Sequence, residues 1–325
     1  MQFENIDFTT TIALRREIIF APVMKRDLIS MLDVKNDLED IIDLGINLKK
    51  KSKSGKSIEL LKGKTLGMIF EKSSTRTRVS FEVGISKLGG HGLFLSKNDI
   101  QLGRGETIED TALVLSRYLD IIMYRAMSNK AMKELAKYAT VPVVSGLDDK
   151  EHPCQVITDL MTIKENKGKL EGLNFVYIGD GKNNMAHSYL LGCGISGMNI
   201  TIVSPRRYWP DSYYVEEAKK FGIKVEITDK VKGSTKNADV IATDTWISMG
   251  DESEKEIRLK EFKDYTINQQ LMQQAKTDAI FMHCLPAYYG YEVTKEVAHG
   301  KQSVIFDEAE NRMWAQIAIM VTLLK

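Results

Sequence analysis

The chain has 325 residues, of which 43% are hydrophobic, enough to bury one large core or, more often, two medium ones. Its 45 Lys and Arg residues balance 44 Asp and Glu, so the surface as a whole does not attract nucleic acids or anionic membranes. Any affinity for anions must therefore be local, and two domains are the expected organisation.

The cysteines and the N-terminus point to a reducing compartment. Cys154, Cys193 and Cys284 are an odd number without CxxC or Cys/His ligand spacing, which argues against a disulfide framework and a zinc site. No stretch approaches the ~18 apolar residues of a membrane span. Residues 1–23 lack the unbroken apolar core of a secretory signal, since 15–17 are Arg-Arg-Glu. We expect a cytoplasmic protein, with the status of this extension left open.

The first half alternates between helical and short apolar segments. A helical beginning is expected from Met24 onward, and the segment 49–56 is typical of a solvated turn. The patterns predict strands at 65–70, 121–124 and 141–144, and helices at 79–88, 108–118 and 129–138. This order is the signature of an α/β domain.

The second half repeats the alternation. The patterns predict strands at 174–178, 200–203, 224–228, 240–243, 279–282 and 304–306, and helices at 185–193 and around 215–221. The predicted fold is α/β, with two doubly wound parallel-sheet domains joined by bridging helices. One domain would comprise 24–154 plus 308–325 and the other 155–307, with helix 155–167 and the last helix as bridges.

A polar hexapeptide, Ser73-Ser74-Thr75-Arg76-Thr77-Arg78, stands between a predicted strand and a predicted helix. Its hydroxyls and free backbone N–H groups would meet the positive end of the helix dipole beside two guanidiniums, which favours an anion site. The plainer interpretation is an ordinary helix cap beside two solvated arginines. A nucleoside triphosphate is not favoured, because the Gly-x-x-x-x-Gly-Lys-Ser/Thr pattern is missing.

Three further short motifs carry reactive or charged side chains. His152-Pro153-Cys154-Gln155 puts an imidazole and an amide three residues apart where Pro153 can open a helix, although a lone His is more often structural. His283-Cys284-Leu285-Pro286 follows a predicted strand at the edge where doubly wound sheets bind ligands, although a free Cys is more often a buried hydrophobe. Arg312 in Glu308-Ala309-Glu310-Asn311-Arg312 would reach an anion or form a salt bridge.

Together these motifs resemble the carbamoyltransferase family over nearly all of 24–325. The matching pieces are Phe-Glu-Lys-Ser-Ser-Thr-Arg-Thr-Arg, His-Pro-Cys-Gln, His-Cys-Leu-Pro-Ala and Glu-Ala-Glu-Asn-Arg, and their combination is specific. The resemblance implies that 24–154 plus 308–325 bind carbamoyl phosphate and that 155–307 bind the amine substrate. It also implies that Arg76, His152, Cys284 and Arg312 are catalytic. The implied carbamoyl phosphate-binding set is Ser74, Thr75, Arg76, Thr77, Gln101, Arg125, His152, Gln155, Cys284, Leu285 and Arg312.

The segment Asp244-Thr245-Trp246-Ile247-Ser248-Met249-Gly250 resembles the loop of the ornithine-specific branch. The resemblance implies that Asp244 pairs with the α-ammonium of ornithine, that Asn184 binds its carboxylate, and that Ser248 and Met249 close over it. Citrulline and phosphate would be the products, formed without a metal or organic cofactor. Gln101 would reach a neighbouring subunit's site, which implies a trimer or a multiple of trimers.

Two alternatives stay open at this point. A sister carbamoyltransferase would act on another amine such as putrescine, but Asp244 would then have no α-amino group to bind. A dinucleotide-binding regulator would use the turn Gly179-Asp180-Gly181, but a full Gly-x-Gly-x-x-Gly is missing because Asn184 stands at its last position. Ornithine is therefore the favoured substrate.

Overall fold

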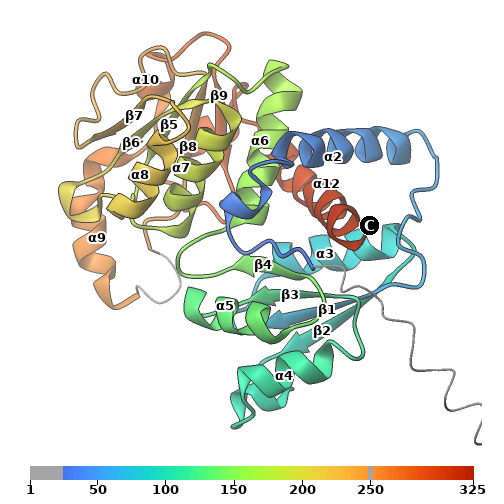
Figure 1. Ribbon diagram of the computed structural model, residues 1–325. Coiled ribbons are helices and arrows are strands. Elements are labelled where there is room, and N and C mark those ends of the chain that lie inside the picture. The colour runs from blue at the N-terminus through green and yellow to red at the C-terminus, as the bar shows by residue number, and fades with distance from the viewer. Residues whose placement is uncertain (1–24, 248–251) are drawn as a thin grey trace, which may run out of the picture.

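A computed structural model describes residues 25–247 and 252–325 as two α/β lobes (Figure 1). The first lobe holds a parallel sheet in the order β2-β1-β3-β4. Its strands are β1 Thr65–Phe70, β2 His91–Ser96, β3 Ile121–Arg125 and β4 Val143–Leu147. The helices around it are α3 Thr75–Lys87, α4 Ile108–Leu115 and α5 Asn129–Tyr138. The central strands are almost fully buried, as their continuous apolar runs predict for a sheet covered on both faces.

The second lobe holds a parallel sheet in the order β7-β6-β5-β8-β9. Its strands are β5 Asn174–Ile178, β6 Asn199–Val203, β7 Val225–Thr228, β8 Val240–Thr243 and β9 Ile280–His283. Its helices are α7 Asn184–Ser196, α8 Ser212–Lys219, α9 Lys255–Glu261, α10 Gln269–Met272 and α11 Lys295–Ala298. Short 3-10 turns occur at Met31–Val34, Gln101–Gly103, Arg206–Tyr208, Glu252–Glu254 and Lys263–Tyr265. The prediction of two parallel-sheet domains is confirmed.

Three helices join the lobes: α2 Leu38–Lys53, α6 Pro153–Lys167 and α12 Ile305–Leu324. In Figure 1, α12 lies between α2 and α3, and it also contacts α6 and β9. α6 begins with Pro153 in its first turn and ends at Gly168, whose φ of 75° suits a left-handed cap. One hydrophobic core runs from Leu66 in β1 through Leu160 and Ile317 in these helices to Met282 in β9. The lobes are therefore packed on shared helices.

The strand order gives each sheet a topological switch point. In the first sheet it lies between β1 and β3, where Phe70 pairs with Arg125 at the carboxyl ends of the strands. In the second it lies between β5 and β8. Loops that follow such strands diverge and leave a crevice, which is where open α/β sheets bind ligands. The fold thus predicts two adjoining ligand-binding edges.

Three expectations and one missed strand differ from the structure. The segment 49–56, expected to be a solvated turn, is helical up to Lys53 in α2. No strand forms at 304–306: Ser303 makes an isolated bridge to Phe281, Val304 is the N-cap of α12, and the helix begins at Ile305. The expected helical beginning at Met24 is also wrong for the described residues, since Leu28 instead bridges Val144 beside β4. β2 was not predicted. Residues 1–23, the predicted extension, lie outside the described residues, and in the described part of the chain no helix is long and apolar enough to cross a membrane.

Candidate active site

The predicted anion-binding motif forms the beginning of α3. Ser74 is the N-cap residue, and its hydroxyl accepts a hydrogen bond from the backbone N–H of Thr77 at 3.3 Å. Thr75, Arg76 and Thr77 occupy the first turn, where backbone N–H groups and the helix dipole favour an anion. Ser74, Thr75 and Arg76 line a cavity of about 580 Å³ between the two lobes. The predicted anion motif is therefore placed at a cavity wall.

Two further guanidiniums converge on this turn. Arg125, the last residue of β3, donates to Oγ1 of Thr77 at 3.3 Å, and Arg312 of α12 donates to the same oxygen at 2.7 Å. Burial lowers the pKa of Arg125 to about 10, and the nearby charges of Arg312 and Arg76 act in the same direction. The Nε atoms of Arg125 and Arg312 are buried and have no hydrogen-bond partner among the described residues. A site of crowded, under-paired cations is suited to an anionic ligand.

His152 lies on the side of the cavity that Arg76, Arg125 and Arg312 line, which we call the cationic wall. Its own side chain is neutral. Burial, together with Arg312 and Arg125, lowers the pKa of its imidazole well below the usual range. Arg312 lies 3.0 Å from Nε2, and because a guanidinium can only donate, Nε2 must accept and Nδ1 must carry the ring proton. Nδ1 is buried without a partner in the described part of the chain. His152 therefore offers one unused N–H donor.

Gln155 lies one helical turn after His152 and is buried. Its Nε2 donates to Asp159 at 2.7 Å and to Glu308 at 3.2 Å, which uses both amide hydrogens. Its Oε1 is buried and unpartnered among the described residues. Gln155 itself is not among the described side chains that line the cavity. The structure thus places it beside the predicted site with a single unused acceptor.

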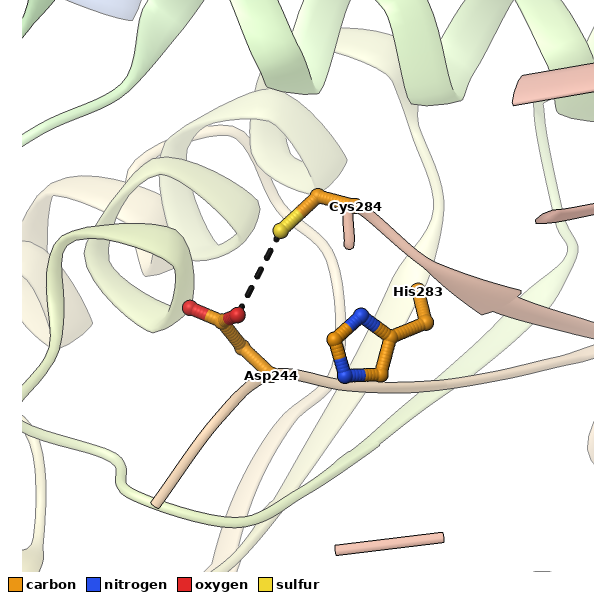
Figure 2. A group of neighbouring side chains, drawn as sticks. All are labelled: Asp244, His283 and Cys284. Atoms are coloured by element: carbon orange, nitrogen blue, oxygen red, sulfur yellow. Dashed lines mark hydrogen bonds between the residues drawn. The ribbon is translucent and has the colours of Figure 1, made fainter. Parts of the chain in front are cut away.

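The opposite wall comes from the second lobe. Asp244 follows β8 and Cys284 follows β9, and the thiol donates to Oδ1 of Asp244 at 3.3 Å (Figure 2). Burial raises the pKa of Asp244, whereas burial and Asp244 together raise the pKa of the Cys284 thiol well above its usual range. Cys284 is therefore a neutral thiol, not a thiolate nucleophile. Leu285 also lines the cavity, with a φ of 59° that non-glycine residues rarely adopt.

Asp244, His283 and Cys284 bring their possible ligand atoms within 4.8 Å of one another (Figure 2). Each of these atoms already has a protein partner. Nδ1 of His283 accepts from the backbone N–H of Leu285 at 2.9 Å, and Nε2 lies 3.2 Å from Glu292. Hydrogen bonding that holds the Cys284 loop accounts for this grouping.

Asn183, which the sequence analysis missed, holds Asp244 in place. It caps α7 by accepting from Ala186, and its Nδ2 donates to Asp244 at 3.2 Å and to Tyr177 at 2.9 Å. The predicted Asn184 lines the cavity and donates to the backbone carbonyl of Asp148 at 2.8 Å. The preference of Asn for helix N-caps was the signal that could have identified Asn183.

Other predicted residues fall elsewhere. Gln101 is exposed in a 3-10 turn and is not among the described residues that line the cavity of its own chain. Ser248 and Met249 lie outside the described residues. Further charged side chains line the cavity without having been predicted: Lys72, Asp148, Asp149, Asp180, Lys182 and Arg258. Lys72 stands inside the Phe70–Arg78 motif, so its position next to the capping serines could have indicated it.

Comparison with known proteins assigns the family. Residues 26–165 match the model of the aspartate/ornithine carbamoyltransferase carbamoyl-P binding domain, and 171–323 match that of the Asp/Orn binding domain. The chain belongs to the aspartate/ornithine carbamoyltransferase family. The two models divide near the end of α6, one on each sheet. Membership agrees with the resemblance that the four motifs indicated.

Relatives in this family are similar over nearly their whole length. Ornithine carbamoyltransferase of Methanosarcina acetivorans is 52% identical over 303 residues, covering 93% of this chain and all of that protein. The enzyme of Oceanobacillus iheyensis is 54% identical over 304 residues, 92% of this chain and 94% of that one. The structure of ornithine carbamoyltransferase from Pyrococcus furiosus aligns with a TM-score of 0.88 at 47% identity, covering 92% and 97% of the two chains.

Proposed function

We propose that this protein transfers the carbamoyl group of carbamoyl phosphate to the side-chain amine of L-ornithine, producing L-citrulline and phosphate. The observation that carries the proposal is one cavity with two unlike walls. Arg76, Arg125 and Arg312 supply positive charge on one side, and Asp244 supplies a carboxylate on the other. Such a cavity suits an anionic donor and a cationic acceptor held together. The names of relatives at 52% and 54% identity support the same reaction.

Carbamoyl phosphate would occupy the cationic wall. The phosphate would accept from the hydroxyls and N–H groups of 74–77, from Arg76 and from Arg125. The carbonyl oxygen would take the unused Nδ1–H of His152 and a hydrogen from Arg312, and the carbamoyl nitrogen would donate to Oε1 of Gln155. The buried unpartnered atoms of His152 and Gln155 would then each gain a partner.

Ornithine would occupy the wall that the second lobe provides. Asp244 would pair with the α-ammonium and Asn184 would bind the carboxylate, as charge-assisted hydrogen bonds. Cys284 and the backbone carbonyl of Leu285 would hold the side-chain amine. Ser248 and Met249 would close over the substrate. Putrescine is the weaker alternative, because a diamine has no α-ammonium group to pair with the buried carboxylate of Asp244.

In the proposed reaction the neutral amine attacks the carbamoyl carbon, a C–N bond forms, and the bond to the phosphate oxygen breaks. A tetrahedral oxyanion forms between these steps. Preorganised donors on His152 and Arg312 would stabilise it, and holding both substrates removes an entropic barrier of roughly 7 to 11 kcal/mol. The attacking nitrogen sheds its surplus protons to phosphate and solvent, and no metal or organic cofactor is needed.

The arrangement of the chain suggests how domains and subunits contribute. We expect residues 24–154 plus 308–325 to form the carbamoyl phosphate domain, because α12 packs on α2 and α3, and 155–307 to form the ornithine domain. Gln101, exposed in its own chain, would complete the site of a neighbouring copy. Light scattering tests this: three chains of 36.7 kDa give about 110 kDa, and a monomer would contradict it.

The deciding experiment is citrulline formation from carbamoyl phosphate, with ornithine, putrescine, lysine and aspartate offered in parallel. Arg76→Ala serves as the blank. Turnover with ornithine that is lost in the variant is the expected result. Product from putrescine instead would move the assignment to the sister enzyme, and no product with any amine would refute the proposal.

A further inference from the structure

Behind the cationic wall lies a buried pair of acids, Asp159 on α6 and Glu308 on α12. Both side chains are fully buried. Both carboxyl groups accept from the Gln155 amide, at 2.7 and 3.2 Å, and two buried carboxylates this close cannot both be ionised, so the pair holds a proton. Burial raises the pKa of Asp159 to about 6 and that of Glu308 well above its usual range. The pair is thus a partly protonated unit at neutral pH.

The contacts of this pair reach α6, α7 and the end of β9, next to the cavity-lining residue Cys284. Asp159 accepts from Gln155 at 2.7 Å and from Tyr189 at 2.7 Å. Glu308 accepts from Gln155 at 3.2 Å and from the backbone N–H of His283 at 2.9 Å. Glu308 also stands one helical turn before Arg312, as Gln155 stands one turn after His152. The acids therefore touch Gln155 and the start of the Cys284 loop together.

These contacts fix the orientation of one amide. A glutamine amide can turn over and exchange its oxygen and nitrogen, and nothing in its shape prevents this. Here both acids act as acceptors, so the NH₂ group must face them and Oε1 must face away. The unpartnered ring nitrogen of His152 and the Nε atoms of Arg125 and Arg312 are all hydrogen-bond donors, whereas Oε1 of Gln155 is an acceptor. The site consequently has a defined hydrogen-bond polarity.

We propose that Asp159 and Glu308 are positioning residues that hold the Gln155 amide in one orientation, so that the site selects a carbamoyl group over an acyl group lacking NH₂. This inference rests on the proposed function and deepens it. A carbamoyl nitrogen donates to Oε1, whereas the methyl group of acetyl phosphate cannot. A site built to accept such a hydrogen discriminates strongly against analogues that lack it.

Glu308→Gln is the sharpest test. The backbone N–H of His283 can only donate a hydrogen bond. The new side chain must therefore direct its oxygen to this N–H and its NH₂ group to Gln155. Two NH₂ groups would then oppose each other while Asp159 still accepts from Gln155, so the amide would keep only one of the two acceptors that fix its orientation. Removing one acid from a crowded pair does not leave an unpaired charge, so the variant is expected to fold. Asp159→Asn is a second test, with a smaller expected loss of affinity for carbamoyl phosphate. The new NH₂ group can face Tyr189, whose hydroxyl can switch from donor to acceptor, so the new side-chain oxygen can still accept from Gln155.

The experiment measures binding of carbamoyl phosphate, acetyl phosphate and inorganic phosphate to each variant by calorimetry. Glu308→Gln is expected to weaken carbamoyl phosphate about 10- to 100-fold while changing acetyl phosphate and phosphate by less than about twofold. In a Gln155→Met background, Glu308→Gln is expected to have no further effect on this ratio. Gln316→Met is the matched control, because Gln316 is also buried on α12, eight residues after Glu308, and its amide has no hydrogen-bond partner among the described residues; all three affinities should stay unchanged.

Equal weakening of all three ligands would reduce the pair to a structural role and overturn the inference, as would an unchanged preference for carbamoyl phosphate. The wild-type assay with ornithine keeps the two proposals distinguishable. If wild-type protein forms citrulline but the ligand preference does not move, only the positioning role fails. If it forms none with any amine, the proposed function fails first.

Discussion

Replacing Arg125 by methionine is expected to stabilise the ligand-free protein and to cost it most of its affinity for carbamoyl phosphate. The guanidinium is buried, and its contacts to Thr77 and to the carbonyl of Gly146 are long, at 3.3 and 3.4 Å. Arg312 and Arg76 are like charges nearby. Methionine keeps the length of the side chain and removes the charge.

The magnitude follows from the pKa of Arg125. Its reduction from 12.5 to about 10 corresponds to about 3 kcal/mol by which the folded, ligand-free site disfavours the charged form. Lost hydrogen bonds offset part of this, so Arg125→Met is expected to raise the free energy of unfolding by about 1 to 3 kcal/mol. Because the folded pKa lies below the unfolded one, the penalty is fully present below about pH 10 and is relieved only above it. The gain should be constant between pH 6 and 8.

Binding should move in the opposite direction. The Arg125 guanidinium would donate two charge-assisted hydrogen bonds to the phosphate. Its loss is therefore expected to lower the affinity for carbamoyl phosphate roughly 100- to 1000-fold. Urea unfolding gives the first quantity and calorimetry the second, with Arg117→Met at an exposed position as the matched control. A ligand-free variant less stable than wild type would refute the reasoning, because Arg125 would then be a net stabilising residue before any anion binds.

Three other changes test separate parts of the structure. Burial raises the pKa of Glu151 to about 7, so the folded state keeps a proton that the unfolded state loses above its ordinary value of 4.5. Stability therefore falls by about 3 kcal/mol as pH rises through this window, and Glu151→Gln should abolish that fall in urea titrations at pH 5 and 8. Asp244→Asn is expected to raise the KM for ornithine at least about tenfold and leave that for carbamoyl phosphate unchanged; a rise in both would place Asp244 in the wrong half of the site. Gly192→Ala would put a methyl group 2.5 Å from Val156 across the α6 and α7 contact, and should cost about 1 to 3 kcal/mol of stability unless these helices separate easily.

Long apolar runs made much of the fold predictable. The expected strands at 65–70 and 174–178 coincide with β1 and β5, which are buried between helices. β2 was missed because it lies at the edge of its sheet and is partly exposed, so its apolar signal is weak. The run Val-Ile-Phe at 304–306 was assigned to a strand because short apolar runs do not distinguish a strand from the first turn of a helix.

The site was predictable where its residues share a motif and not where they meet through space. The sequence places Ser74 and Thr77 on one turn, and the structure agrees. Nothing local to Thr77 indicates that Arg125 and Arg312 both donate to its hydroxyl. The orientation of Gln155 likewise depends on Glu308, which is 153 positions away along the chain. Such relations follow from the packing of α6 and α12.

The meeting of two switch points at one cavity has an evolutionary consequence. The residues proposed to bind the donor follow β1 and β3, whereas Asp244 and Cys284 follow β8 and β9 of a different sheet. Loops of the second lobe can therefore be exchanged for ones that fit another acceptor while the activated donor stays in place. The family description, with a single carbamoyl-P domain beside a domain for either aspartate or ornithine, matches this separation. A chimaera that joins the first lobe to another acceptor lobe would need compatible surfaces only on the connecting helices.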